Sequence, residues 1–167
     1  MKTSSKKGNT DKMKRVYVNE EWCLGCHLCE FYCAAANSGE SDMIKAFKKE
    51  GVNPLPRITV EEGGDVNFAV QCRQCPDPIC VKSCITGALS KKDGVISVDE
   101  SRCVGCYTCV SACPFGCIVI DERHTPIAKC DLCTKNGSGE PACVKGCPNR
   151  AIVFEENLQE GGGCSDE

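Results

Sequence analysis

Sixteen of the 18 cysteines in this sequence fall into four groups with short, recurrent spacings. Two groups follow C-x2-C-x2-C-x3-C, and the other two begin with a C-x2-C pair and end with a C-x3-C pair. In chain order, quartets one to four are Cys23, Cys26, Cys29 and Cys33; Cys72, Cys75, Cys80 and Cys84; Cys103, Cys106, Cys109 and Cys113; and Cys130, Cys133, Cys143 and Cys147. Clustered thiolates bind metal, and the C-x2-C-x2-C-x3-C-P run is typical of [4Fe-4S] clusters.

The spacing favours iron-sulfur clusters over zinc. Three closely spaced thiolates on a tight loop can reach three corners of one cubane, while a fourth cysteine beyond the next turn points elsewhere. Two C-x2-C pairs would suffice for a structural zinc ion, and zinc chemistry requires no third cysteine three residues further on. The four quartets therefore predict four [4Fe-4S] clusters, with their sixteen cysteines as iron ligands.

Disulfides are the other common use of cysteine at this density. The first 22 residues are polar and lysine-rich, with no apolar stretch ahead of a small-residue cleavage site. No apolar run approaches the roughly 18 residues of a membrane-spanning helix. We therefore expect a cytoplasmic, reduced chain without a membrane span, in which closely spaced cysteines bind metal rather than each other.

Internal repeats relate the quartets to one another. Residues 16–26 line up with residues 96–106, and residues 78–84 line up with residues 141–147, so quartets one and three are copies, as are two and four. After the last three quartets, Cys117 occupies the position where the other two copies have Ala88 and Ala151. Cys117 is therefore predicted to be a small packing residue and not a ligand. Cys164 lies alone in the acidic, glycine-rich tail and is expected to be a free thiol, also not a ligand.

The segments between the quartets predict short strands and helices. Residues 88–90 and 95–98 flank a turn with glycine, and residues 57–60 and 66–70 flank a second one, so two hairpins are expected. Residues 41–51 combine a serine cap, an early acid, late lysines and a terminal glycine, which predicts a short helix. The expected fold class is α+β, with small lobes of paired strands and short helices around clusters.

Nothing else in the sequence resembles catalytic machinery. It has no phosphate-cradling glycine loop, no G-x-S-x-G elbow and no H-E-x-x-H motif. His27 and His124 stand alone, and we expect packing or surface roles for them. The basic N-terminal stretch has no interleaved aromatic residue before Tyr17, so nucleic-acid binding is not expected. Four clusters in one small chain predict an electron conduit that is not itself an enzyme.

Cations close to the clusters are candidates for tuning their potentials. Four oxidised clusters of about −2 each, thiolates included, would take the formal net charge from −3 to about −11. Each candidate cation lies within three residues of a predicted ligand, and ordinary surface charge is the alternative role for each. These cations are Arg73, Lys82, Arg102, Lys129, Lys145 and Arg150.

The four quartets resemble the four-cluster ferredoxin-like electron-transfer subunits that accompany molybdopterin, tungstopterin, hydrogenase and carbon monoxide dehydrogenase catalytic subunits. Residues 33–41, 54–61 and 71–75 are most similar to the ferredoxin subunit of nickel carbon monoxide dehydrogenase. The resemblance implies a hetero-oligomer in which this chain relays electrons between a catalytic subunit and a second redox protein. Two alternatives are the same relay for a tungsten or molybdenum aldehyde or formate oxidoreductase, and a structural or regulatory metal-binding protein.

The resemblance also implies that each quartet gives its last cysteine to a partner's cluster. The residues alone leave adjacent and nested pairings open, and the family favours nesting of one with four and two with three. The implied ligand sets are Cys23, Cys26, Cys29 and Cys147; Cys130, Cys133, Cys143 and Cys33; Cys72, Cys75, Cys80 and Cys113; and Cys103, Cys106, Cys109 and Cys84. Two bacterial-ferredoxin-like lobes with two clusters each would follow: an outer lobe of residues 1–65 and 123–156, an inner lobe of residues 66–122, and a flexible tail at 157–167.

Overall fold

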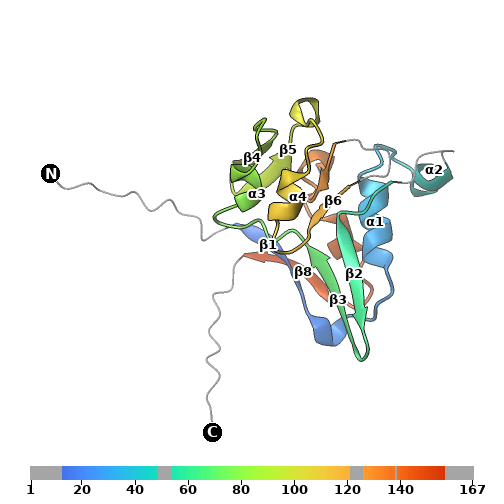
Figure 1. Cartoon of the computed structure of the whole chain (residues 1–167). Coiled ribbons are helices and arrows are strands. Elements are labelled where there is room, and N and C mark those ends of the chain that lie inside the picture. The colour runs from blue at the N-terminus through green and yellow to red at the C-terminus, as the bar shows by residue number, and fades with distance from the viewer. Residues whose placement is uncertain (1–12, 49–53, 121–125, 138, 157–167) are drawn as a thin grey trace, which may run out of the picture.

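The computed structural model describes residues 13–48, 54–120, 126–137 and 139–156, which form short helices and short strands (Figure 1). The strands are β1 (Lys14–Val18), β2 (Ile58–Gly63), β3 (Val66–Gln71), β4 (Leu89–Lys92), β5 (Val95–Val98), β6 (Ile118–Val119), β7 (Ala128–Lys129) and β8 (Ile152–Glu156). The helices are α1 (Leu28–Ala36), α2 (Met43–Lys48), α3 (Ile79–Lys82), α4 (Thr108–Ala112) and α5 (Ala142–Lys145), with 3₁₀ turns η1 (Glu20–Trp22), η2 (Glu100–Arg102) and η3 (Thr134–Asn136). Among these described helices, none has the length and apolar character needed to cross a bilayer.

The two ends of the described chain meet in a ladder. β1 pairs antiparallel with β8, with Val16 opposite Phe154 and Val18 opposite Ile152, and Figure 1 shows these strands side by side. β4 pairs with β5, and β6 with β7, within the middle and later parts of the chain. The antiparallel strands and short helices expected from the sequence are confirmed, and the β1–β8 ladder brings quartets one and four close together.

Both predicted hairpins form. Asp93 (φ 47°) and Gly94 (φ 80°) connect β4 to β5, and two left-handed residues in succession are what a tight type I′ hairpin turn requires. β2 and β3 are longer than predicted and turn at Gly64 (φ 60°). The predicted helix is present as α2, but its cap is different. The Oδ1 of Asp42, rather than the serine, accepts a hydrogen bond from Lys45 N at 3.0 Å.

Two buried apolar clusters stabilise the fold, and both include predicted ligands. The first contains Val16, Cys29, Cys33, Ile58, Val60, Ala69, Leu132, Cys143 and Ile152. The second contains Cys80, Leu89, Ile96, Cys109, Ile118 and Ile127. Because cysteines occupy positions that larger apolar side chains would normally fill, groups bound by these sulfurs would complete the cores.

Strand pairing crosses both predicted lobe boundaries. The β2–β3 ladder joins residues 58–63 to residues 66–71, on either side of the boundary after residue 65. The β6–β7 ladder likewise joins Ile118 to Lys129 across the boundary after residue 122. The two halves therefore share hydrogen-bonded strands, and the division into an outer and an inner lobe stays a prediction.

Candidate metal centres

Quartets one and three lie on loops of the same shape. His27 (φ 57°) and Tyr107 (φ 56°) both adopt left-handed backbone conformations immediately before α1 and α4. The third cysteines, Cys29 and Cys109, lie in the first turns of these helices, and both are 6% exposed. The duplication in the sequence is thus repeated in the backbone.

Quartets two and four share a second arrangement. α3 follows Pro78 and α5 follows Pro141, each proline standing at the N-cap, where a missing N–H costs nothing. Each helix carries the third cysteine of its quartet, Cys80 or Cys143, in a buried position. The helix then ends just before the fourth cysteine, which is free to face a different loop.

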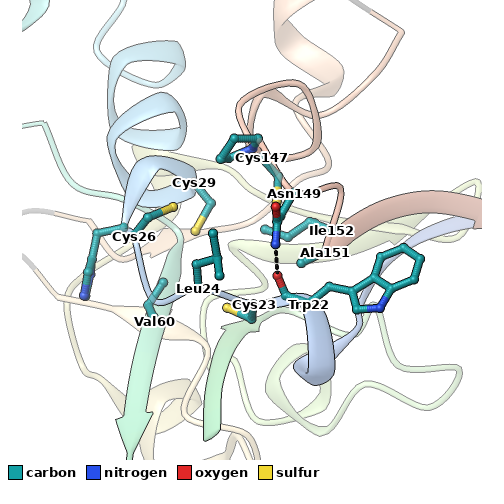
Figure 2. A pocket seen from close by; sticks show the side chains of 12 residues that line it. Trp22, Cys23, Leu24, Cys26, Cys29, Val60, Cys147, Asn149, Ala151 and Ile152 are labelled. Atoms are coloured by element: carbon teal, nitrogen blue, oxygen red, sulfur yellow. Dashed lines mark hydrogen bonds between the residues drawn. The ribbon is translucent and has the colours of Figure 1, made fainter. Parts of the chain in front are cut away.

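The first predicted ligand set surrounds one cavity. Figure 2 shows the thiols of Cys23, Cys26, Cys29 and Cys147 around a common space, which measures about 340 Å³ including the part open to solvent. Cys147 arrives from the far end of the chain, and nearby Asn149 Nδ2 donates to Trp22 O at 2.9 Å. The remaining wall is largely apolar and includes Leu24, Val60 and Ile152.

The third predicted set surrounds a second cavity of similar size. Cys72, Cys75, Cys80 and Cys113 line a space of about 350 Å³, again including the part open to solvent. Its wall also includes Ile79, Ile96, Phe115, Ile118, Cys117 and Lys129. Two quartets that are separate in sequence therefore supply thiols to one cavity, as in the first site.

In each of the other two predicted sets, the four cysteines also lie close to one another. Burial raises the pKa of Cys143, and negative charge on Cys130, Cys33 and Cys133 adds to the rise. Burial likewise raises the pKa of Cys109, with contributions from Cys84, Cys103 and Cys106. Cys33 and Cys143 belong to the first buried cluster, with Cys130 packed against it, and Cys109 belongs to the second, with Cys84 and Cys103 packed against it.

The sites adjoin one another. Negative charge on Cys29, from the first set, contributes to the raised pKa of Cys143, from the second. Burial raises the pKa of Cys130 to about 12, and Cys72, from the third set, adds to the rise. α3 packs against α4, which connects the third and fourth sets. The sets thus follow one another through the molecule.

The donors fit a cluster better than a single ion. Iron ligands must be thiolates, and burial raises the pKa of Cys29 and Cys130 to about 12, so these sulfurs need positive charge beside them to ionise. Iron in a cluster would supply that charge. The thiols of the first and third sets line cavities that a cluster of several atoms would fill.

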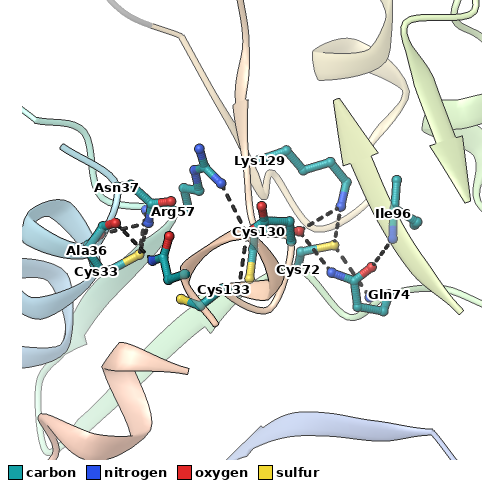
Figure 3. Close-up of polar contacts among 12 residues, drawn as sticks. Cys33, Ala36, Asn37, Arg57, Cys72, Gln74, Ile96, Lys129, Cys130 and Cys133 are labelled. Atoms are coloured by element: carbon teal, nitrogen blue, oxygen red, sulfur yellow. Dashed lines mark hydrogen bonds and ion pairs between the residues drawn. The ribbon is translucent and has the colours of Figure 1, made fainter. Parts of the chain in front are cut away.

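Several hydrogen bonds reach the sulfurs (Figure 3). Arg57 N donates to Cys33 Sγ at 3.2 Å, and Lys129 Nζ lies 2.8 Å from Cys72 Sγ. Such bonds stabilise negative sulfur and influence redox potential. Lys129 was among the predicted cations, whereas Arg57 was not, because it lies far from the first quartet in sequence.

The other predicted cations whose contacts are defined do not reach sulfur. Lys82 Nζ pairs with Asp77 at 2.7 Å, and both side chains are exposed. Arg102 donates to Thr86 O at 2.7 Å, and the Arg73 guanidinium lies 5.0 Å from the Phe115 ring centre. Lys82 and Arg102 fit the surface-charge alternative, whereas Arg73 also lines the cavity of the third set.

The structure describes one of the two histidines, His27, and one of the two cysteines outside the quartets, Cys117. His27 is exposed, and its hydrogen bonds with Glu62 and Glu30, both 2.9 Å, raise its pKa. Cys117 is buried and donates to Gln71 O and Phe115 O, each at 3.1 Å. His124 and Cys164 lie outside the described residues.

A family model described as a 4Fe-4S dicluster domain matches residues 66–157, which include quartets two, three and four. The chain belongs to this family. An iron-sulfur protein of Rhodospirillum rubrum is 39% identical over 154 residues, covering 82% of this chain and 79% of that protein. The predicted [4Fe-4S] chemistry is therefore shown, while the number of clusters remains a prediction.

Two Escherichia coli K12 relatives extend the comparison. The electron transport protein HydN is 34% identical over 146 residues, covering 78% of this chain and 81% of HydN. The putative oxidoreductase AegA is 39% identical over 156 residues, covering 88% of this chain but 22% of AegA. The chain thus spans most of an electron transport protein and about a fifth of a longer relative.

Proposed function

We propose that this chain relays electrons through four [4Fe-4S] clusters between a nickel carbon monoxide dehydrogenase catalytic subunit and a second redox protein. The observation that carries the proposal is the succession of thiol sets. Cys29 and Cys143 belong to one buried cluster, and Lys129 Nζ contacts both Cys72 Sγ and Cys130 O, so neighbouring sets adjoin. A continuous series of sites is what electron passage across a small protein needs, whereas a structural metal would need no such continuity.

The protein's own contribution is to hold and insulate the clusters. The sixteen quartet cysteines would bind the iron in the nested sets given above, and each bound cluster would exchange one electron at a time. Leu24, Val60 and Ile152 give one cavity an apolar wall, and Ile96 and Ile118 do so in another. Backbone and side-chain donors such as Arg57 N and Lys129 Nζ would stabilise the negative sulfurs.

The catalytic partner is inferred from similarity. AegA, in which a segment like this chain is joined to a much longer putative oxidoreductase, supports a role beside a catalytic unit. The segments that resemble the carbon monoxide dehydrogenase subunit include the first four residues of β2, the last residue of β3 and both partners of the contact between Arg57 N and Cys33 Sγ, so they lie against the predicted sites. Assembly with other subunits and a cytoplasmic location belong to the same proposal.

Cluster content tests the relay. Protein purified without oxygen should contain about sixteen iron and sixteen sulfide per chain, and potentiometric titration followed by electron paramagnetic resonance should resolve reduction of four clusters. We expect low potentials suited to ferredoxin-level chemistry. The structural or regulatory alternative would be favoured if all four clusters had reduction potentials above about 0 mV. It would also be favoured if no reductant or partner reduced them.

The partner is tested separately. The full-length chain should be purified from its own cells without oxygen, and retained subunits identified by mass spectrometry. We expect a nickel carbon monoxide dehydrogenase subunit, and carbon monoxide should bleach the cluster absorbance of the complex. Bleaching by an aldehyde or by formate, with a tungsten or molybdenum subunit retained, would replace the carbon monoxide assignment and leave the relay intact.

A further inference from the structure

Lys129, the last residue of β7, places its ammonium group inside the protein. The residue is 3% exposed, and Nζ lies 2.8 Å from Cys72 Sγ and 3.3 Å from Cys130 O (Figure 3). A buried ammonium is costly unless negative groups or acceptors surround it. Among the described residues, no carboxylate forms an ion pair with Lys129. The Cys72 sulfur, as a thiolate, is therefore the negative partner that this cation needs.

A buried glutamine holds the Lys129 contact in place. Gln74 is 0% exposed, and its Nε2 donates to the same Cys130 carbonyl at 2.9 Å, while its Oε1 accepts from Ile96 N at 2.8 Å. With both ends of its amide bonded, Gln74 fixes the carbonyl that also receives Lys129. The ammonium therefore sits at the junction between the site of Cys72 and the site of Cys130.

The cation beside the neighbouring site is neutralised, unlike Lys129. Arg57 donates its backbone N–H to Cys33 Sγ, but its Nη1 lies 3.2 Å from Asp131 Oδ1, and both side chains are largely buried. The positive charge of Arg57 is thus balanced by a carboxylate. The two adjoining sites differ in local charge, since only the one that contains Cys72 has a positive group bonded directly to sulfur among the described contacts.

We propose that Lys129 is a positioning residue that raises the reduction potential of the cluster held by Cys72, Cys75, Cys80 and Cys113. Reduction makes a cluster more negative, and a fixed positive charge beside one of its sulfurs stabilises the reduced form, strongly so in a dry interior. Electrons would then settle preferentially on this cluster rather than on its neighbour at Cys130. The inference rests on the proposed function, because it requires Cys72 to be a cluster ligand.

Three variants of the full chain test the inference by potentiometric titration under electron paramagnetic resonance. Lys129→Met removes the charge and the donor, and Lys129→Gln removes the charge but keeps a donor. Each should lower the potential of the cluster at Cys72 most, lower that of the neighbouring cluster at Cys130 less, and leave the other two unchanged. At the potential where the cluster at Cys72 is half reduced in the native protein, its reduced fraction should fall severalfold. Lys82→Met is the matched control and should change nothing, because Lys82 is exposed and pairs with Asp77.

The possible outcomes separate this inference from the proposed function. Native protein without four clusters would overturn both. Four clusters with unchanged potentials in Lys129→Gln would overturn the role of Lys129 and leave the relay standing. If both Lys129 variants lose a cluster, their potentials cannot be compared, and a measurement on the native protein tests the inference instead. Labelled with ¹⁵N-lysine and reduced, it should show hyperfine coupling between a lysine nitrogen and one cluster, and absence of that coupling would overturn the inference.

Discussion

Cys117 and Ala88 occupy equivalent buried positions, each directly after a left-handed glycine and four residues beyond the last cysteine of its quartet. They are 6% and 2% exposed, and the preceding Gly116 and Gly87 have φ of 61° and 62°. Ala151, 1% exposed, completes the set of three copies. The structure thus supports the alignment that marks the end of each quartet, although Cys117 also lines the cavity of Cys72.

Replacement of Cys117 by alanine should leave the iron content unchanged. The sulfur of Cys117 donates to two backbone carbonyls, which the thiolate of a ligand could not do. Loss of these weak bonds should cost at most about 1 kcal/mol of unfolding free energy. Iron and sulfide analysis is the measurement, and Cys113→Ala is the control that should lose one cluster. A similar loss in Cys117→Ala would make Cys117 a ligand.

Alanine at Gly25 should destabilise the protein more than alanine at its copy, Gly105. Both glycines are left-handed, at φ 65° and 66°, so both changes carry a backbone penalty of about 1–2 kcal/mol. A Cβ at Gly25 would also lie 2.9 Å from Asn67 Cγ, whereas at Gly105 the nearest atom is Tyr107 Oη at 3.6 Å. Anaerobic denaturant titrations of both variants measure the difference.

Asn67→Ala provides the control for the Gly25 prediction. It removes the side chain that the new Cβ would meet. In the Asn67→Ala background, Gly25→Ala and Gly105→Ala should therefore lower the free energy of unfolding by more similar amounts. Equal destabilisation of Gly25→Ala and Gly105→Ala in the native background would show that Asn67 moves aside without cost.

Removal of the Asp131 carboxylate should be strongly destabilising. Asp131 Oδ1 lies 3.2 Å from Arg57 Nη1 and accepts from Cys133 N at 3.2 Å, and its side chain is 5% exposed. Asp131→Ala would leave Arg57 buried without a partner and loosen the fourth quartet, at a cost of about 3 kcal/mol. The exposed pair of Asp77 and Lys82 is the comparison, since Asp77→Ala should cost within about 0.5 kcal/mol. Similar unfolding free energies for the two variants would contradict this account.

The sequence predicted what depends on local chemistry. The quartets follow from spacing alone, and the β4–β5 hairpin follows from Asp93 and Gly94, which tolerate the left-handed turn. Asp42 displaced the predicted serine cap because two capping residues stand side by side, and spacing could not choose between them.

The contacts to sulfur could not be predicted in the same way, because they join distant segments. Arg57 reaches Cys33 only after β2 has packed against α1. Gln74 lies between the predicted ligands Cys72 and Cys75, where its sequence position alone does not indicate a contact of its own. One signal was available: Gln74 occupies the position of Leu132 in the fourth quartet, and a polar residue in a position that its copy leaves apolar indicates a buried hydrogen bond.

Double variants distinguish nested from adjacent ligand pairing. If Cys26 and Cys147 bind the same cluster, as their shared cavity suggests, Cys26→Ala with Cys147→Ala should lose one cluster and retain about twelve iron atoms. Cys26→Ala with Cys33→Ala should lose two clusters and retain about eight, although both cysteines belong to one quartet. Anaerobic iron analysis measures both, and each single variant should lose one cluster. Under adjacent pairing, Cys33 and Cys147 would each serve a different cluster from that of Cys26, so both double variants would retain about eight iron atoms. The reverse order of iron contents would mean that Cys33 binds with its own quartet. Either result would make nesting wrong.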